Sequence, residues 1–269
     1  MWFLLKADWK QFLLYSRYEI VEFSKKITNR RISLWLLLIF STLMILIGHN
    51  SIEVIDRDEA RFAQASKQMV QTSDIITVKF QDDLRAKKPI GIYWLQSTSA
   101  LLFGSEEISS YRFPSLLGFI LSVVISYLFV RNLWSDSRHL QQVVSASLLA
   151  SSFIVLAESH LAKTDSILLS LIIAQQFALW LIYKNRFKQN ATSAKRWVWV
   201  FMALAILVKG PIAPLLAVFT LLGLIVIDRD WRWLGQLHFL SGLFIISVIC
   251  LPWVFAVSIA TDGIFLSQA

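Results

Sequence analysis

Seven apolar runs constrain this chain more than any other feature of its sequence. They cover residues 32–48, 113–133, 141–158, 166–183, 197–208, 212–227 and 237–257. Most of them approach the roughly 20 residues that an α-helix needs to cross about 30 Å of hydrocarbon. The chain is 56% hydrophobic, whereas an average soluble domain is roughly 45–50% apolar. The sequence therefore predicts an all-α, polytopic helical bundle in a membrane, with about seven spans.

Two apolar segments are shorter than a standard membrane-spanning helix. The run 197–208 is short, and Lys209-Gly210-Pro211 follows it directly. We expect it to form a helical hairpin with 212–227, with these three residues as the turn. The segment 90–103 is apolar but only about 14 residues long, which favours a surface or re-entrant helix over a full span.

The basic residues indicate how the chain is oriented in the membrane. The chain has 26 Lys and Arg against 18 Asp and Glu, and the basic residues concentrate at the ends of the apolar runs. This distribution sets topology and does not predict a nucleic-acid partner. Residues 1–31 mix aromatic and basic side chains, which predicts an interfacial amphipathic helix in contact with membrane lipids; a disordered basic tail is the alternative. Loop 184–196 has five basic residues and no acidic one, so both segments are expected in the cytoplasm.

This orientation places a long polar loop, residues 49–112, on the outer side of the membrane. The connections at 159–165 and 209–211 fall on the same side. Connections of such length are usually functional. The polar candidates brought to this side are Asp58, Glu59, Arg61, Lys88, Asp165 and Lys209. They are far apart in the sequence but are expected at one membrane interface, which is the main indication of a site.

Acidic residues follow the first span directly. Asp56, Asp58 and Glu59 lie where a helix is expected to begin, and carboxylates suit the positive end of a helix dipole. One interpretation makes Asp58 a general base, or a metal-assisted orienting carboxylate, for attack on an activated sugar. Simple capping of a helix at the membrane surface is an equally good interpretation of the same residues.

A second polar cluster lies in the tight connection between two later spans. It contains Glu158, His160, Lys163 and Asp165, and ionisable groups beside spans are functional candidates. Asp165 and Asp58 are candidate ligands of a divalent metal ion, with His160 as a further ligand, although the spacing matches no zinc motif. The alternatives are that Asp165 caps the next helix and that His160 is only hydrogen-bonded.

Two lysines are candidates for binding a phosphate. Lys88 precedes Pro89 and an aromatic segment with Tyr93, and Lys209 lies in the tight turn between two spans. A lysine can meet a lipid-linked phosphate as a point charge. The alternatives are an ordinary interfacial anchor for the first and a side chain that snorkels outward for the second.

Five short motifs, taken in order, resemble those of a known family. They are Asp58-Glu59-Ala60-Arg61-Phe62-Ala63, Lys88-Pro89-Ile90 with Tyr93-Trp94, Thr164-Asp165 entering a span, Leu207-Val208-Lys209-Gly210-Pro211, and Leu251-Pro252-Trp253. The chain thereby resembles the C-type membrane glycosyltransferases of the protein mannosyltransferase and aminoarabinose transferase group. The resemblance covers roughly residues 30–260.

The resemblance implies a function and roles for the candidate residues. Such enzymes transfer a sugar, with inversion, from a polyprenyl-phosphate donor to a lipid, glycan or protein acceptor. By resemblance, Asp58 and Asp165 are the catalytic carboxylates, and Lys88 and Lys209 hold the lipid phosphate. Glu59, Arg61 and Tyr93 complete the expected substrate-binding set. Lys87 stands where several members carry an acid, which argues against a metal site of that kind.

The expected protein is therefore an inner-membrane glycosyltransferase whose active site faces the periplasm. Residues 32–260 form its expected core. Residues 261–269 form an outer tail and a candidate truncation point, because members of this family are usually much longer. Two alternatives are a transporter or flippase for lipid-linked sugars and a non-catalytic membrane scaffold. A transporter would need polar residues near the centres of its spans, and the runs here are largely apolar.

Overall fold

A computed structural model describes residues 30–133, 139–187 and 192–268, so the predicted interfacial helix lies almost wholly outside the described residues. Almost all of the described secondary structure is helical. The helices are α2 (Arg30–Leu46), α3 (Arg57–Thr72), α4 (Gly91–Phe103), α5 (Ile108–Leu133), α6 (His139–Ala150), α7 (Phe153–Ser159), α8 (Asp165–Lys184), α9 (Thr192–Lys209), α10 (Ile212–Asp228), the 3₁₀ helix η1 (Arg232–Leu237), α11 (Phe239–Ala260) and α12 (Ile264–Gln268).

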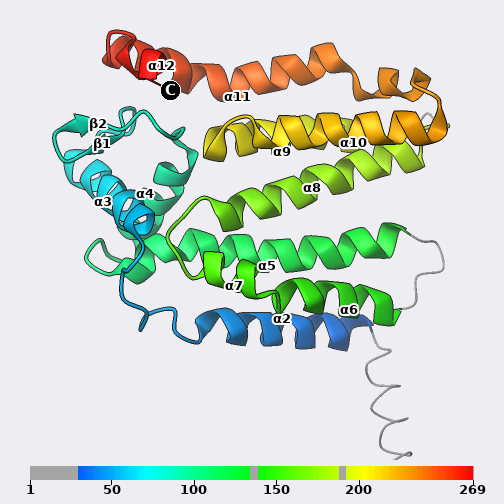
Figure 1. The fold of residues 1–269 in the computed structure, drawn as a ribbon, viewed down its shortest axis with the longest axis horizontal. Helices are drawn as coiled ribbons and strands as arrows, with labels where there is room; N and C mark the ends of the chain where they lie inside the picture. The colour runs from blue at the N-terminus through cyan, green and yellow to red at the C-terminus, as the bar shows by residue number, and fades with distance from the viewer. Residues whose placement is uncertain (1–29, 134–138, 188–191, 269) are drawn as a thin grey trace, which may run out of the picture.

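The long apolar helices lie side by side and alternate in direction (Figure 1). Packing contacts link α2 to α6, α6 to α5, α5 to α8, α8 to α9 and α9 to α11, while α10 packs on α9. Helices with few polar side chains can pack their apolar faces against one another and expose the remaining apolar surface to lipid. The helices α3, α4 and α12 gather at one end of this row (Figure 1). The predicted all-α membrane bundle is thus confirmed as a class.

Three helical stretches of the described chain are long and apolar enough to cross a membrane: Ile108–Leu133, Asp165–Lys184 and Arg232–Ala260. The predicted run 141–158 is not one straight helix, because α6 and α7 meet at a break with a bend of 58°. Counted as one bent span, this pair makes a fourth. The apolar helices Ile32–Leu46 and Ile212–Asp228 are shorter than a standard span.

The polar loop predicted at 49–112 folds as a unit. Asp56 begins α3 by accepting hydrogen bonds from the backbone N–H groups of Asp58 and Glu59, and Ser73 ends it in the left-handed conformation. A short antiparallel hairpin follows, β1 (Lys79–Phe80) and β2 (Asp83–Leu84), which the sequence analysis did not anticipate. The segment predicted as a surface or re-entrant helix is α4, 13 residues long.

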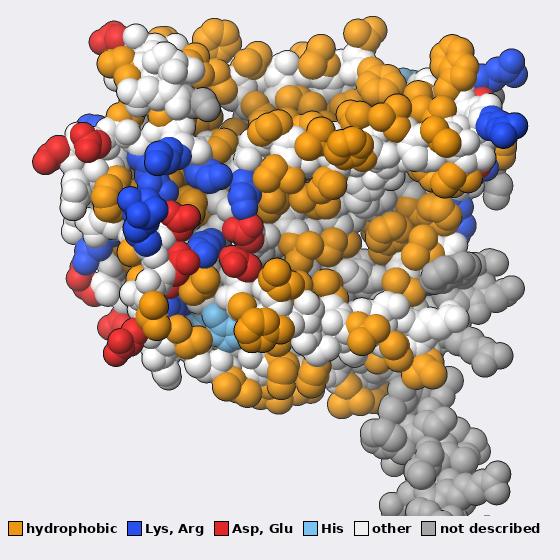
Figure 2. Space-filling model, viewed as in Figure 1, with side chains coloured by type: hydrophobic (Ala, Val, Ile, Leu, Met, Phe, Trp, Pro, Cys, Tyr) orange, Lys and Arg blue, Asp and Glu red, His pale blue; other side chains and the backbone are white. Residues whose placement is uncertain are grey.

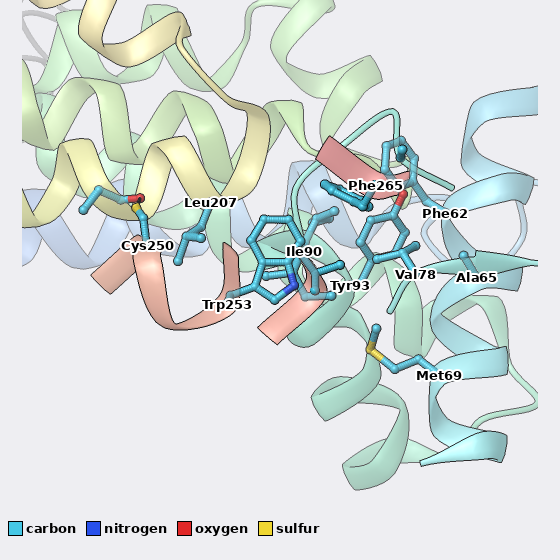
Figure 3. Close-up of a cluster of buried hydrophobic side chains, with 14 residues drawn as sticks. Phe62, Ala65, Met69, Val78, Ile90, Tyr93, Leu207, Cys250, Trp253 and Phe265 are labelled. Carbon is cyan, nitrogen blue, oxygen red and sulfur yellow. Dashed lines mark hydrogen bonds between the residues drawn. The ribbon is translucent and has the colours of Figure 1, made fainter. Parts of the chain in front are cut away.

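A buried apolar cluster fastens this unit to the ends of the long helices (Figure 3). Phe62 and Tyr93 pack together with ring centroids 5.6 Å apart, and the same cluster includes Leu207 of α9 and Trp253 of α11. Gly91 makes the closest approach: a Cβ at this position would lie 2.7 Å from the carbonyl oxygen of Leu207. The polar unit is therefore packed directly against α9 and α11.

Candidate functional site

Charged side chains gather at the end of the molecule that carries the polar unit, and hydrophobic side chains cover most of the helices beyond it (Figure 2). The connections that hold the candidate residues, 49–112, 159–165 and 209–211, all lie at that end (Figure 1). The three segments are brought together because the apolar helices alternate in direction. The expectation that these segments meet at one end of the bundle is confirmed.

Asp58 lies in the first turn of α3 and is the most accessible of the candidate acids. Its side chain is 62% exposed, and Nη1 of Arg61 lies 3.7 Å from its Oδ1. The neighbouring Asp56 uses Oδ1 to accept from the backbone N–H groups of Asp58 and Glu59, at 2.8 and 2.9 Å. Asp56 therefore caps α3, which was the alternative interpretation for this acidic group. The Asp58 carboxylate is not the group that caps the helix.

Glu59 occupies a completely different environment from its neighbour. Its carboxylate is fully buried and pairs with the fully buried Arg112 of α5, Nε to Oε1 at 2.7 Å and Nη2 to Oε2 at 3.1 Å. The backbone N–H of Ala162 donates to the same Oε1 at 2.8 Å. Nη1 of Arg112 donates to the carbonyls of His49 and Ile52, both at 2.8 Å. This pair ties together the segment that follows α2, the helices α3 and α5, and the connection that leads to Asp165.

Asp165 begins α8 and is paired with Lys209, Nζ to Oδ1 at 2.5 Å. The pair joins two connections that are 44 residues apart, with side chains 39% and 20% exposed. Lys163 makes the link to the first acidic group, because its Nζ lies 3.0 Å from Oδ2 of Asp56 and 3.8 Å from Glu158. The backbone N–H of Glu59 and the side chain of Lys163 hold the pKa of Asp56 below its usual value. The connection 159–165 is therefore tied to α3 through Lys163 and Ala162, and to α9 through Lys209.

A cavity of about 340 Å³ opens beside these pairs. Lys88 and Lys209 both line it, although they are far apart in the sequence, and Pro89 and Pro211 lie next to them. Lys87 also lines the cavity, and most of the remaining wall is apolar, including Trp253 and Leu266 of the C-terminal helices. Neither Asp58 nor Asp165 lines this cavity, but Asp165 reaches its edge through the bond to Lys209. A cavity with cations at one side and apolar walls suits a phosphate attached to a hydrocarbon chain.

Tyr93 is buried in the apolar cluster that includes Leu207 and Trp253, two residues that line this cavity. Its hydroxyl accepts a hydrogen bond from Nε of Arg85 at 2.9 Å, and burial raises its pKa. The guanidinium of Arg85 also lies over the ring of Phe62, 5.2 Å from the centroid. The predicted binding residue is thus enclosed by α3 and the hairpin, while Arg85 carries the charge nearest to it.

The metal candidates do not converge in the described structure. Both ring nitrogens of His160 face backbone carbonyls, Nδ1 at 2.8 Å from Leu156 O and Nε2 at 2.9 Å from Ile47 O. Within the described ranges, no group of three or more His, Cys, Asp or Glu side chains is placed to hold a metal ion. His160 joins α7 to the end of α2, which is the simply hydrogen-bonded role considered as its alternative.

Two basic residues of this region, Arg112 and Arg85, were not among the predicted site residues. Arg112 is the more prominent, since it is a fully buried cation at the start of an apolar helix. Its place beside a span was a usable signal, because ionisable groups there are costly unless paired. Arg85 gave no such signal. Lys163 was named in the second polar cluster, but its pairing with Asp56 follows only from the folded chain.

The alternating apolar helices and the charged unit at one end define a helical, polytopic membrane protein. The chain belongs to the dolichyl-phosphate-mannose-protein mannosyltransferase family, whose model matches residues 87–255. The matched range includes Lys88, Tyr93, Asp165 and Lys209, whereas Asp58 precedes it. The family resemblance inferred from the five motifs is thus confirmed.

Curated relatives and solved structures agree with this assignment. An undecaprenyl phosphate-alpha-4-amino-4-deoxy-L-arabinose arabinosyl transferase of Pseudomonas aeruginosa is 31% identical over 236 residues, 85% of this chain and 41% of the relative. A relative of the same name from Proteus mirabilis is 29% identical over 233 residues, 83% of this chain and 40% of its own length. The chain thus spans about two fifths of the curated relatives that it matches.

The fold is similar to that of ArnT from Cupriavidus metallidurans. The crystal structure in the apo state has a TM-score of 0.75 at 20% identity, covering 84% of this chain and 42% of that chain. The crystal structure bound to undecaprenyl phosphate has a TM-score of 0.72, also at 20% identity, covering 84% of this chain and 41% of that chain.

Proposed function

We propose that this chain is the membrane core of a glycosyltransferase that takes a sugar from a polyprenyl-phosphate donor. One observation carries the proposal: Lys88 and Lys209, from segments far apart in the sequence, line one cavity together with Lys87, and most of its remaining wall is apolar. Two cations can bind a phosphate, and apolar walls can hold the isoprenoid chain attached to it. The curated relatives are named for an undecaprenyl-phosphate sugar, which makes 4-amino-4-deoxy-L-arabinose the first sugar to test.

In the proposed reaction, Asp58 accepts the proton of the acceptor hydroxyl as the acceptor oxygen attacks the anomeric carbon. The bond from that carbon to the phosphate oxygen breaks, and its electron pair leaves with the polyprenyl phosphate. Lys88 and Lys209 stabilise the charge that develops on the phosphate. A single displacement of this kind inverts the anomeric configuration and needs no nucleophile from the enzyme.

The remaining candidates take supporting roles in this proposal. Asp165 orients Lys209 through their 2.5 Å contact, and Arg61 adjusts the position of Asp58 from 3.7 Å. Glu59 and Tyr93 are fully buried, so we assign them to positioning α3 and α4 rather than to direct contact with substrate. A divalent metal ion is left out of this reaction scheme, which needs none.

The same proposal includes a topology. The seven segments that cross the membrane are α2, α5, the bent pair α6 and α7, α8, α9, α10 and α11. The shorter α2 and α10 lie alongside the long helices (Figure 1), and their outward residues are apolar, including Trp35, Ile39, Leu43, Phe219 and Val226. With the basic connection 184–196 in the cytoplasm, the charged unit faces the periplasm across the inner membrane.

The test is transfer from labelled undecaprenyl-phosphate aminoarabinose to lipid A, to a glycan or to a protein by the purified chain. Asp58→Asn should reduce the rate about 10²–10⁴-fold, the effect of losing a general base, while donor binding stays unchanged. Lys88→Ala should weaken donor binding instead. Movement of the donor across vesicles without transfer would support a flippase. If the chain shows neither transfer nor movement of the donor, the result would support a scaffold. A folded Asp58→Asn protein with an unchanged rate would reject the assigned base.

A further inference from the structure

A second cavity lies at the opposite end of the helices from the charged unit, between the first turns of α9 and the start of α11. Its volume is about 260 Å³, and Lys195, Arg196, Trp199, Ser241 and Phe244 are among the residues that line it. We call this cavity the basic groove. It shares no residue with the cavity of Lys88 and Lys209, so any ligand it holds is separate from the proposed donor.

The floor of the basic groove is a well-held aromatic ring. Trp199 is buried, its Nε1 donates to the carbonyl of Leu237 at 2.8 Å, and its ring meets Phe239 edge-on at 5.6 Å between centroids. Gly242 allows this arrangement, because a Cβ there would lie 2.0 Å from the Trp199 ring. The groove therefore has a defined wall that several contacts hold in place.

The two cations at the groove are not paired with any acid that the structure describes. Among the described residues, neither Lys195 nor Arg196 makes an ion pair. The described acids at this end are engaged elsewhere: Asp228 contacts Arg186 at 3.2 Å, and Asp230 accepts from the backbone N–H of Arg232 at 2.9 Å. The positive charge of the groove is thus available to an anion.

The surface next to the groove is strongly apolar. On α11, Leu240 is 87% exposed and Phe244 is 70% exposed, and Leu243 is also exposed. A helix with such an outer surface faces hydrocarbon. The groove therefore opens toward lipid, with its cations at the end of the helices, where phosphate headgroups lie.

We propose that the basic groove binds an anionic phospholipid of the surrounding bilayer. Lys195 and Arg196 contact the headgroup phosphate, and one acyl chain lies along Trp199 and Phe244. Basic pockets between transmembrane helices bind anionic headgroups in this way. The inference does not depend on the proposed glycosyl transfer, since it rests on residues at the other end of the molecule.

The test is a lipid titration of the purified chain in detergent, followed by native mass spectrometry. Phosphatidylglycerol should bind more tightly than phosphatidylcholine with the same acyl chains. The double variant Lys195→Gln/Arg196→Gln should weaken phosphatidylglycerol binding about 25-fold, because each cation near a membrane surface is worth about 1 kcal/mol. Binding of phosphatidylcholine should be unchanged in that variant.

A matched control removes the same charge nearby. Arg229→Gln/Arg232→Gln also deletes two cations at this end, but neither residue lines the groove, so phosphatidylglycerol binding should change less than about threefold. Ser241→Trp keeps the charge and fills the groove, and should weaken binding of both lipids. Equal affinity for the two lipids, or an equal loss in the control, would overturn the proposal. So would displacement of phosphatidylglycerol by equimolar undecaprenyl phosphate, which would make the groove a donor-lipid site.

Discussion

Replacing Arg112 by methionine would leave the carboxylate of Glu59 buried without its counter-charge. Both side chains have no exposed surface, so water cannot take the place of the lost guanidinium. Methionine retains much of the length and apolar volume of arginine, which makes the change mainly electrostatic. The variant also removes the donor that serves the carbonyls of His49 and Ile52.

The expected loss of stability is large. Removing one partner of a buried ion pair costs about 3–5 kcal/mol, since a buried charge is left uncompensated. The two carbonyls that lose their hydrogen bonds add about 1 kcal/mol each at most. We therefore expect Arg112→Met to lower the free energy of unfolding by about 5 kcal/mol. Glu59→Leu should cost slightly less, because the guanidinium keeps its two carbonyl acceptors.

The double variant Glu59→Leu/Arg112→Met separates the charge effect from simple loss of packing. Replacing both members of a buried pair by apolar residues is often close to neutral, so the double variant should be more stable than either single one. The coupling between the two sites should then reach at least about 2 kcal/mol, within the range seen for residues in direct contact.

The measurement is thermal unfolding in mixed micelles, monitored by tryptophan fluorescence, for the wild type, the two single variants and the double variant. For a chain of this size, the Arg112→Met midpoint should fall by roughly 10 °C. Single variants that each lose less than about 1 kcal/mol, or a double variant equal to the sum of the two, would refute the reasoning. A second readout tests the positioning role: the double variant should fold but transfer sugar more slowly, because Glu59 also holds the backbone of Ala162 beside Asp165.

Two further perturbations test how the polar unit is built. Gly91→Ala should destabilise the chain by about 1–3 kcal/mol, because the new Cβ would lie 2.7 Å from the Leu207 carbonyl oxygen. The control Gly223→Ala should be tolerated, because a Cβ at that position would have nothing within 4 Å. Equal thermal midpoints for the two variants would contradict this packing. Asp56 has a lowered pKa, so its stabilisation is present above the usual value of 3.8 and is lost as pH falls through the folded-state pKa. Asp56→Asn keeps a capping oxygen but loses the carboxylate charge that pairs with Lys163. Its stability difference from wild type should shrink below pH 3.8, and a difference that persists there would show that this charge is irrelevant.

Much of this protein could be predicted because apolar runs respond to a simple physical requirement. A backbone in hydrocarbon must satisfy its own hydrogen bonds, so long apolar runs become helices whatever their neighbours do. Their alternation then brings Asp165 and Lys209 to the end that holds the polar loop. The bend between α6 and α7 and the hairpin at 79–84 escaped prediction, because each depends on a few local residues whose conformation the surrounding helices select.

In the candidate site, too, the sequence predicts one part and only the fold decides the other. Asp58 and Glu59 are adjacent in the sequence and chemically alike, so a pattern treats them as one acidic group. The fold separates them: Asp58 is 62% exposed, while Glu59 is enclosed beside Arg112. The helical turn points the two side chains to different faces of α3, and only one of those faces packs on α5.

The amino-acid sequence alone determined the class of this protein, the end of the bundle at which its polar residues collect and the family to which it belongs. These follow from hydrophobicity and short motifs, which are local properties. Only the tertiary structure decided which charged groups pair. Asp165 pairs with Lys209, whereas Lys195 makes no ion pair among the described residues. Ion pairing depends on distances of a few ångströms between segments remote in the chain, and no local pattern encodes such distances.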